Sequence, residues 1–149
     1  KNLEILLTKR STNLKNHPGQ IAFPGGKKEK FDSSPIETAL RETEEEVGLS
    51  PHLVEIIASL PTHKTATGFI IKPYIGAISL PFEETLRCGE VDEIFTIPFS
   101  HILNEENFSI QTRNWNGSQR KYYAIPYGPY YVWGATARIL LNLSQALSR

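Results

Sequence analysis

Four glutamates crowd into one short stretch of the chain, at Glu42, Glu44, Glu45 and Glu46. Gly48 follows them, and a glycine here is typical of the left-handed residue just beyond a helix C-terminus. Anions at that end oppose the helix macrodipole by roughly 0.3–1 kcal/mol each, and like charges three or four residues apart repel by roughly 0.2–0.5 kcal/mol per pair. Since stability alone would not favour this arrangement, it indicates a compensating cation.

The chemistry suited to these side chains is the binding of a hard divalent cation, because Mg²⁺ is held by a few carboxylates together with water and substrate phosphates. On a helix, Glu42, Glu45 and Glu46 share one face, whereas Glu44 lies away from it. Arg41 can relieve part of the repulsion by pairing with glutamates four residues away on either side. The alternative is an acidic face that is simply solvated.

The helix that must carry these residues has clear start and stop signals. Ser34 is a suitable N-cap, Pro35 fits the first helical position, and Glu37 completes a capping box. The sequence therefore predicts a helix that begins at Pro35 and ends near Val47. Its apolar stripe is expected to pack on the core and consists of Ile36, Ala39, Leu40, Thr43 and Val47.

The remaining pattern predicts an α/β fold without linkers or repeats. The dipeptide Asn116-Gly117 is a strong hairpin signal, and the segment after Trp133 has helical spacing of apolar residues. Strands are expected at 3–8, 20–23, 54–60, 69–78 and 91–97, a helical turn at 100–103, a hairpin of 108–115 with 119–125, and a helix at 133–147.

Composition indicates a single domain, residues 1–149, with a core of its own. Sixteen basic and sixteen acidic residues cancel, so we expect no recruitment by nucleic acid or membrane. The one cysteine, Cys88, excludes an internal disulfide and fits a reducing, cytoplasmic location.

The chain starts at Lys1 and enters an apolar run almost at once. Preceding residues are therefore expected to be missing, including a first strand and, in a eukaryote, any organellar targeting segment.

The acidic segment resembles a known motif. Gly26, Asp32 and the run Arg41-Glu42-Thr43-Glu44-Glu45-Glu46-Val47-Gly48-Leu49 are similar to the Nudix box, which reads G, five residues, E, seven residues, REUxEExGU with U apolar. Two positions depart from that pattern. Ser33 stands where the first glutamate belongs, with Asp32 one place earlier as its expected substitute, and Thr43 replaces an apolar residue.

A second motif lies just upstream and indicates a subfamily. The segment Leu6–Ser11, Gly19 and the segment Phe23–Gly26 resemble the LLTxRSxxxRxxxGxxxFPGG signature of Nudix coenzyme A diphosphatases. Lys15 stands where the signature has arginine, which keeps the charge but loses the planar fork for bidentate phosphate contacts.

These resemblances imply an α/β/α sandwich with a mixed sheet and a metal-dependent hydrolase. Coenzyme A or its thioesters would be cleaved at the diphosphate, with Mg²⁺ or Mn²⁺ neutralising charge and activating water. Glu42, Glu45, Glu46 and the carbonyl of Gly25 or Gly26 would hold the metal. Glu45 is also the expected base, and Arg41 would orient the glutamates.

The substrate-binding residues are expected in the upstream signature and in one later loop. They are Arg10, Lys15, His17, Gly25, Gly26 and Lys64. The alternative for the basic residues is that they lie in solvated loops. The tyrosines and the tryptophan between residues 122 and 133 could stack an adenine, or they could instead belong to the core.

Another nucleoside diphosphate derivative, such as NADH, ADP-ribose or a nucleotide sugar, is the rival substrate. A silent nucleotide-sensing module is the rival function, and a homodimer stays open.

Overall fold

The chain contains both helices and strands, as the sequence predicts for an α/β protein. The computed structural model describes residues 2–148. Within it the chain forms two compact units, one from Leu7 to Phe95 and the other from the residues up to Leu6 together with those from Thr96 onward.

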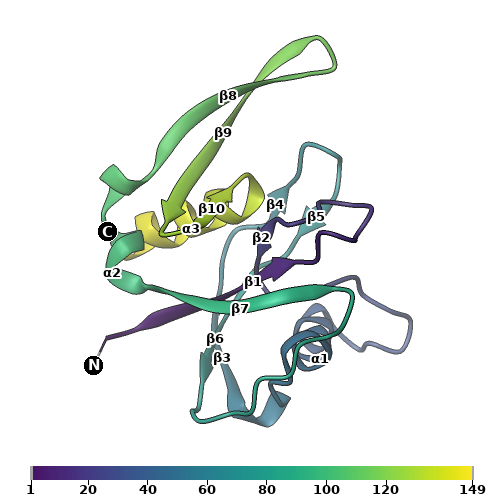
Figure 1. Cartoon of the computed structure of the whole chain (residues 1–149). Coiled ribbons are helices and arrows are strands. Elements are labelled where there is room, and N and C mark those ends of the chain that lie inside the picture. The colour runs from purple at the N-terminus through teal and green to yellow at the C-terminus, as the bar shows by residue number, and fades with distance from the viewer. Residues whose placement is uncertain (1, 149) are drawn as a thin grey trace. The chain divides into compact units, whose positions relative to one another are not determined.

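The first unit contains the long acidic helix and short antiparallel pairs of strands (Figure 1). Strands β1 and β7 each continue into the second unit, and β1 lies between β2 and β7 in a three-stranded sheet. Strand β3 pairs with β6, and β4 with β5. The bounds are β1 Glu4–Arg10, β2 Ile21–Ala22, α1 Pro35–Val47, η1 Pro51–Leu53, β3 Val54–Ser59, β4 His63–Lys64, β5 Ile70–Ile71, β6 Tyr74–Ile78 and β7 Val91–Pro98.

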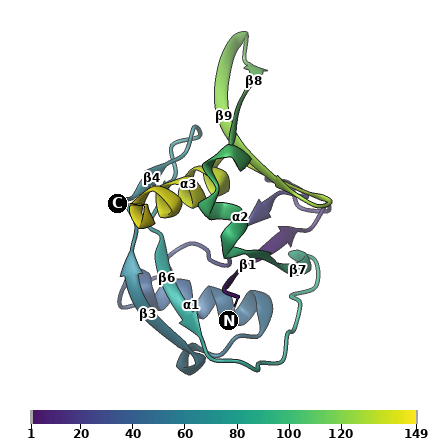
Figure 2. The same cartoon turned by 90° about the vertical axis from the view of Figure 1, so that its left-hand side faces the viewer.

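The second unit is a three-stranded antiparallel sheet, in the order β10-β9-β8, packed on a helix (Figure 2). Ile125 and Val132 of the sheet and Ala137 and Leu140 of the helix have no solvent exposure, so their apolar surface forms the core here. The bounds are α2 Phe99–Leu103, η2 Glu105–Asn107, β8 Ser109–Trp115, β9 Ser118–Tyr127, β10 Tyr130–Trp133 and α3 Ala135–Leu147.

The local signals for α1 act largely as predicted. The Glu37 amide donates to Ser34 Oγ at 3.2 Å, and Gly48 has a φ of 81° and donates its amide to the Glu44 carbonyl at 2.9 Å. The Glu37 carboxylate turns back to Ser33, one residue before the N-cap. The helix therefore begins and ends where the sequence places it.

The predicted apolar stripe of α1 is only partly correct. Val47 is fully buried, whereas the other four members, Ile36, Ala39, Leu40 and Thr43, are half-buried. The polar residues Thr38 and Glu46 are buried instead. Both make hydrogen bonds to the segment before the helix, so polar contacts decide which part of α1 is covered.

Two other predictions change in the structure. The expected strand 69–78 divides into β5 and β6, because Pro73 lies between them and has no amide to donate to a sheet. Tyr130–Trp133 forms β10 against β9, so the last helix begins at Ala135 rather than at Trp133. The Asn116-Gly117 hairpin is confirmed, and both residues have the positive φ of a type I′ turn, 49° and 79°.

No helix among residues 2–148 is long and apolar enough to cross a membrane.

The replacement Gly48→Ala should lower the free energy of unfolding by about 1–2 kcal/mol. The alanine would have to keep the left-handed φ of this position, and its Cβ would meet atoms of Glu83 and Thr85 at 3.0 Å. Gly89→Ala is the matched control, since its φ is 84° but its surroundings are open. Urea unfolding of both variants measures the difference. Equal losses would show that backbone strain, rather than the fit of the helix end against its neighbours, sets the cost.

Candidate active site

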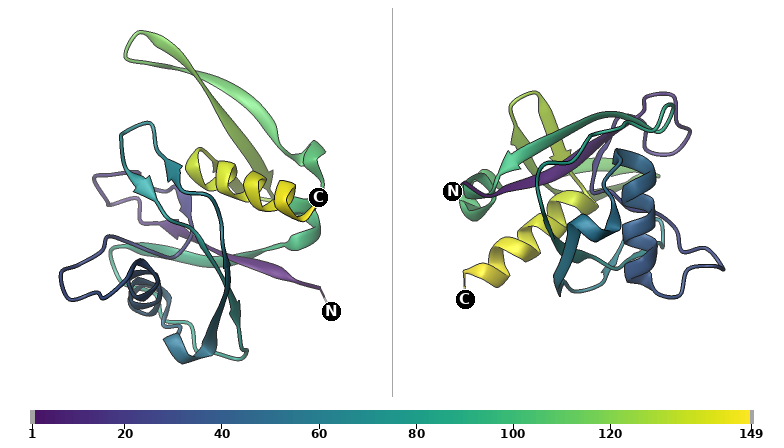
Figure 3. Two further views of the ribbon diagram at one scale, coloured as in Figure 1. Left: turned by 180° about the vertical axis from the view of Figure 1, so that it is seen from behind. Right: turned by 90° about the horizontal axis from the view of Figure 1, so that it is seen from below.

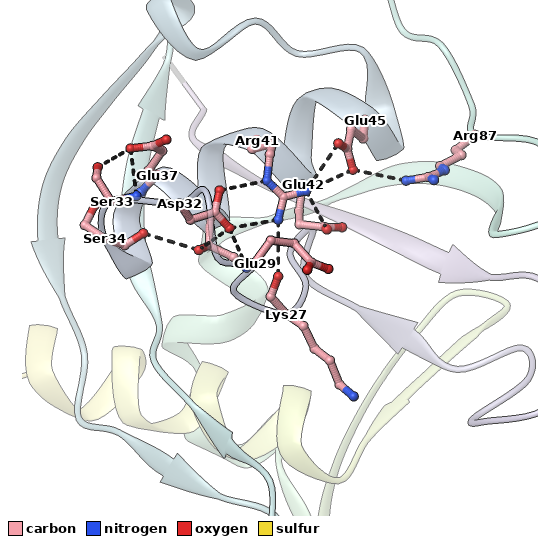
Figure 4. Close-up of polar contacts among 11 residues, drawn as sticks. Lys27, Glu29, Asp32, Ser33, Ser34, Glu37, Arg41, Glu42, Glu45 and Arg87 are labelled. Carbon is pink, nitrogen blue, oxygen red and sulfur yellow. Dashed lines mark hydrogen bonds and ion pairs between the residues drawn. The ribbon is translucent and has the colours of Figure 1, made fainter.

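Asp32 and Arg41 form the ion pair around which the other polar contacts of this site are arranged (Figure 4). Arg41 donates from Nε to Asp32 Oδ1 at 2.9 Å and from Nη2 to Oδ2 at 3.0 Å. Asp32 is only 4% exposed and also accepts from the Glu29 amide at 2.8 Å and Thr38 Oγ1 at 2.9 Å. The Arg41 guanidinium, with these donors, holds the pKa of Asp32 well below its usual range.

Arg41 uses its remaining donors on the glutamates and on the preceding loop. Nη1 lies 2.9 Å from Glu42 Oε1 and 3.2 Å from Glu45 Oε1, and Nη2 donates to the Lys27 carbonyl at 3.2 Å. The hydrogen bonds to Asp32 above all, and those to Glu42 and Glu45, raise the pKa of Arg41 above its ordinary value. The side chain thus ties the loop before α1 to the acidic end of that helix.

A second arginine, Arg87, lies on the other side of Glu45. Its Nη1 is 3.1 Å from Glu45 Oε2, and its Nε is 3.5 Å from Glu90 Oε2. Its amide also donates to the Glu46 carbonyl at 3.1 Å, which helps to satisfy the end of α1. The sequence analysis did not single out Arg87 or Glu90. They lie more than 40 positions beyond Glu45 and Glu46 in the chain, and no local pattern connects them to α1.

Glu46 is the most buried of the glutamates on α1, with 9% exposure. Its Oε1 accepts from the Gly25 amide at 2.8 Å. The pKa of Glu46 is raised to about 7, chiefly by burial. The hydrogen bond from Gly25 and the Arg10 guanidinium oppose this rise, and the negative charges of Glu42 and Glu90 contribute to it. Glu42, Glu90 and Arg10 therefore all act electrostatically on Glu46.

Gly26 lets the loop approach α1 closely. A Cβ at this position would lie 2.4 Å from Glu42 Cδ and 2.5 Å from Glu42 Oε2. No side chain larger than hydrogen fits while Glu42 keeps this conformation. The Pro24–Gly26 backbone and the acidic face of α1 are thus direct neighbours.

The residues fit a hard divalent cation by their chemistry. Carboxylate oxygens are the donors that Mg²⁺ and Mn²⁺ favour, and a buried carboxylate with a raised pKa regains its charge most readily beside a cation. In the part of the chain that the structure describes, no three His, Cys, Asp or Glu side chains are already gathered as a metal shell. Instead the three glutamates of the prediction contact Arg41, Arg87 and the Gly25 amide.

The predicted substrate-binding residues divide into two groups. Gly25 and Gly26 lie against the glutamates, and Arg10 acts on Glu46 through its charge. Arg10 donates to the carbonyls of Asn16 and His17 at 3.1 and 3.3 Å, which shapes the loop between β1 and β2. The other group consists of Lys15, His17 and Lys64, which are exposed and whose side chains make none of the contacts described above.

Comparison with known proteins identifies the class to which this fold and site belong. Residues 1–114 match the NUDIX domain family. The chain is 38% identical to the uncharacterized Nudix hydrolase NudL of Enterobacter sp. (strain 638) over 140 residues, which is 94% of this chain and 73% of that protein. NudL of Escherichia coli (strain K12) is 37% identical over the same shares of the two chains.

A solved structure agrees on the fold. The NUDIX domain of Shewanella oneidensis NrtR, crystallised with ADP ribose, superposes with a TM-score of 0.52 at 23% identity, over 68% of this chain and 66% of that chain, just under two thirds. The family match and the NudL relatives place the chain among the Nudix hydrolases, which generally use divalent metal cations. The chain belongs to the Nudix family and is a Nudix hydrolase, so the predicted family and fold are confirmed.

The replacement Asp32→Asn should destabilise the protein in a pH-dependent way. The folded pKa of Asp32 is lowered, so its stabilising contribution is present above the unfolded pKa of about 3.9 and is lost as the pH falls below it. Urea unfolding at several pH values should give a difference between wild type and variant that is largest near pH 7 and shrinks below about pH 4. Glu44→Gln, an exposed change on the same helix, should show no such trend. A constant difference would contradict the ion-pair assignment.

Proposed function

We propose that the protein is a coenzyme A diphosphatase. It hydrolyses the diphosphate bond of coenzyme A or its thioesters to give phosphopantetheine, or acyl-phosphopantetheine, and adenosine 3′,5′-bisphosphate. The proposal goes beyond the family, because the names of the NudL relatives state no substrate.

The observation that carries the proposal is the direct contact between the two sequence motifs. The Gly25 amide of the coenzyme A signature binds Glu46 of the Nudix box, and Gly26 lies against Glu42. Arg10, from the first part of the signature, is close enough to influence the charge of Glu46. The segment typical of the coenzyme A branch therefore forms one wall of the acidic site.

Each residue has a role that follows from its contacts. Glu42 and Glu46, with Glu45, are the carboxylates that would hold Mg²⁺ or Mn²⁺, which when bound neutralises diphosphate charge and lowers the pKa of water. Arg41 orients Glu42 and Glu45 from its anchor on Asp32. Arg10 supplies a guanidinium beside the glutamates that suits a phosphate oxygen. Glu45 is the proposed base, and Glu90 adds a carboxylate to the same site.

The replacement Glu46→Gln should reduce turnover by about 100-fold or more while the fold persists, because the amide keeps an oxygen to accept from Gly25 but loses the negative charge. Glu44→Gln is the matched control, since this glutamate lies on the same turn but is exposed. Steady-state kinetics with Mg²⁺ and circular dichroism of both variants provide the measurement. Full activity in a folded Glu46→Gln protein would refute the metal assignment.

Substrate choice is tested by comparing coenzyme A, acetyl-coenzyme A, ADP-ribose and NADH under the same conditions with Mg²⁺ and with Mn²⁺. The proposal expects the highest kcat/KM with a coenzyme A compound. Equal or higher values with ADP-ribose would favour the rival reading, to which the ADP ribose bound by the NrtR domain lends weight. Binding without hydrolysis of any substrate would instead indicate a nucleotide-sensing module.

A further inference from the structure

The sheet β10-β9-β8 has two faces of different character. One face packs on α3: Ile125 and Val132 are fully buried, and the Arg138 guanidinium of α3 lies over the Tyr123 ring, 5.2 Å from its centroid. The β8–β9 ribbon extends beyond the helix, with the Asn116-Gly117 turn at its far end (Figure 3). Because side chains alternate along a strand, the neighbours of Tyr123 and Ile125 point to the other face.

That other face carries an arginine-aromatic patch, which we define as Arg113, Trp115, Arg120, Tyr122, Tyr131 and Trp133. The strand register places Arg113 opposite Arg120 and Trp115 opposite Ser118. The Arg113 guanidinium lies 5.3 Å from the Trp133 ring centroid and 5.7 Å from that of Trp115. Tyr122 meets Trp133 edge to face at 5.1 Å, and its hydroxyl is 3.2 Å from that of Tyr131.

The patch is accessible and unbalanced in charge. Trp115 and Tyr131 are 41% and 46% exposed. Residues 109–133 contain Arg113, Arg120 and Lys121 but no aspartate or glutamate. Like charges directly opposite each other in an antiparallel pair of strands destabilise that pair. Stability alone would therefore not select two facing arginines on an exposed ribbon, and an anion bound between them would remove the repulsion.

We infer that this patch binds an adenine nucleotide, with its phosphate at Arg113 and Arg120 and its base on Trp115. The identity of the nucleotide rests on the proposed function. A flat ring carrying phosphate matches both features of the patch, since aromatic side chains stack bases and paired guanidinium groups bind phosphate oxygens. A second copy of the chain is disfavoured as the occupant, because two such cationic faces would repel each other.

The two tryptophans of the chain, Trp115 and Trp133, both belong to the patch, so intrinsic tryptophan fluorescence reports on it directly. Adenosine 3′,5′-bisphosphate, titrated into the full chain without metal, should quench this emission. The replacement Arg120→Gln should raise the Kd about tenfold, as expected for the loss of one charge-assisted contact. Lys121→Gln is the matched control: it removes the same charge from the next residue, which faces the other side of the sheet, and should change the Kd less than twofold.

Trp115→Leu provides an independent test of base stacking. Calorimetric titration should show the bisphosphate Kd raised about tenfold, because stacking of one base on an aromatic ring contributes about 1–3 kcal/mol. Circular dichroism checks that each variant is folded.

Several results would overturn the inference: no quenching, equal losses in Arg120→Gln and Lys121→Gln, an unchanged Kd in Trp115→Leu, or quenching by an oligoadenylate RNA but not by the bisphosphate. Coenzyme A turnover by the same wild-type preparation separates this inference from the proposed function. Turnover without bisphosphate binding would contradict the patch alone, whereas specific binding without turnover of coenzyme A would support the patch and contradict the proposed activity.

Discussion

The contact on which the candidate active site depends is the bidentate ion pair between Arg41 and Asp32. It joins a side chain of α1 to the loop that precedes the helix, and three further groups converge on it: the Glu29 amide, Thr38 and the Lys27 carbonyl. Removal of either charge would leave the other partly buried without its partner, which is much more costly than the loss of an exposed pair. Because Arg41 also contacts Glu42 and Glu45, the same anchor fixes the directions of the acidic side chains.

A net charge of zero conceals strong local separation of charge in this chain. Glutamates gather at the end of α1, while the β8–β9 ribbon carries cations and no acid. Like charges that lie this close together cost stability, and a bound ligand of opposite charge would offset that cost on either surface. The zero net charge excludes a strong long-range field from the chain as a whole, but it says nothing of the local charge at the end of α1 or on the β8–β9 ribbon.

The acidic helix could be predicted because its signals lie close together in the sequence. The rest of the site could not be predicted, because its residues are far from the helix along the chain. Caps at Ser34 and Gly48 determine where α1 begins and ends, and once the helix is placed, its periodicity puts Glu42, Glu45 and Glu46 together. Arg87 and Glu90 reach that face only through the folded path of the chain after β6. The burial of Thr38 and Glu46 was likewise unpredictable from hydrophobicity, because hydrogen bonds to the preceding loop determine it.

The end of α1 is less unfavourable in the folded protein than its sequence suggests. Its last carbonyls accept amides from Gly48, Thr85 and Arg87, at 2.9, 2.9 and 3.1 Å. Glu45 lies between the guanidinium groups of Arg41 and Arg87, which partly offset its repulsion by neighbouring acids and by the macrodipole. Arg41 and Arg87 therefore supply part of the positive charge that this acidic helix end requires. Since those arginine contacts occupy the oxygens of Glu45, a metal ion that uses this residue must compete with them, whereas Glu46 has only the Gly25 amide as a hydrogen-bond donor among the contacts described here.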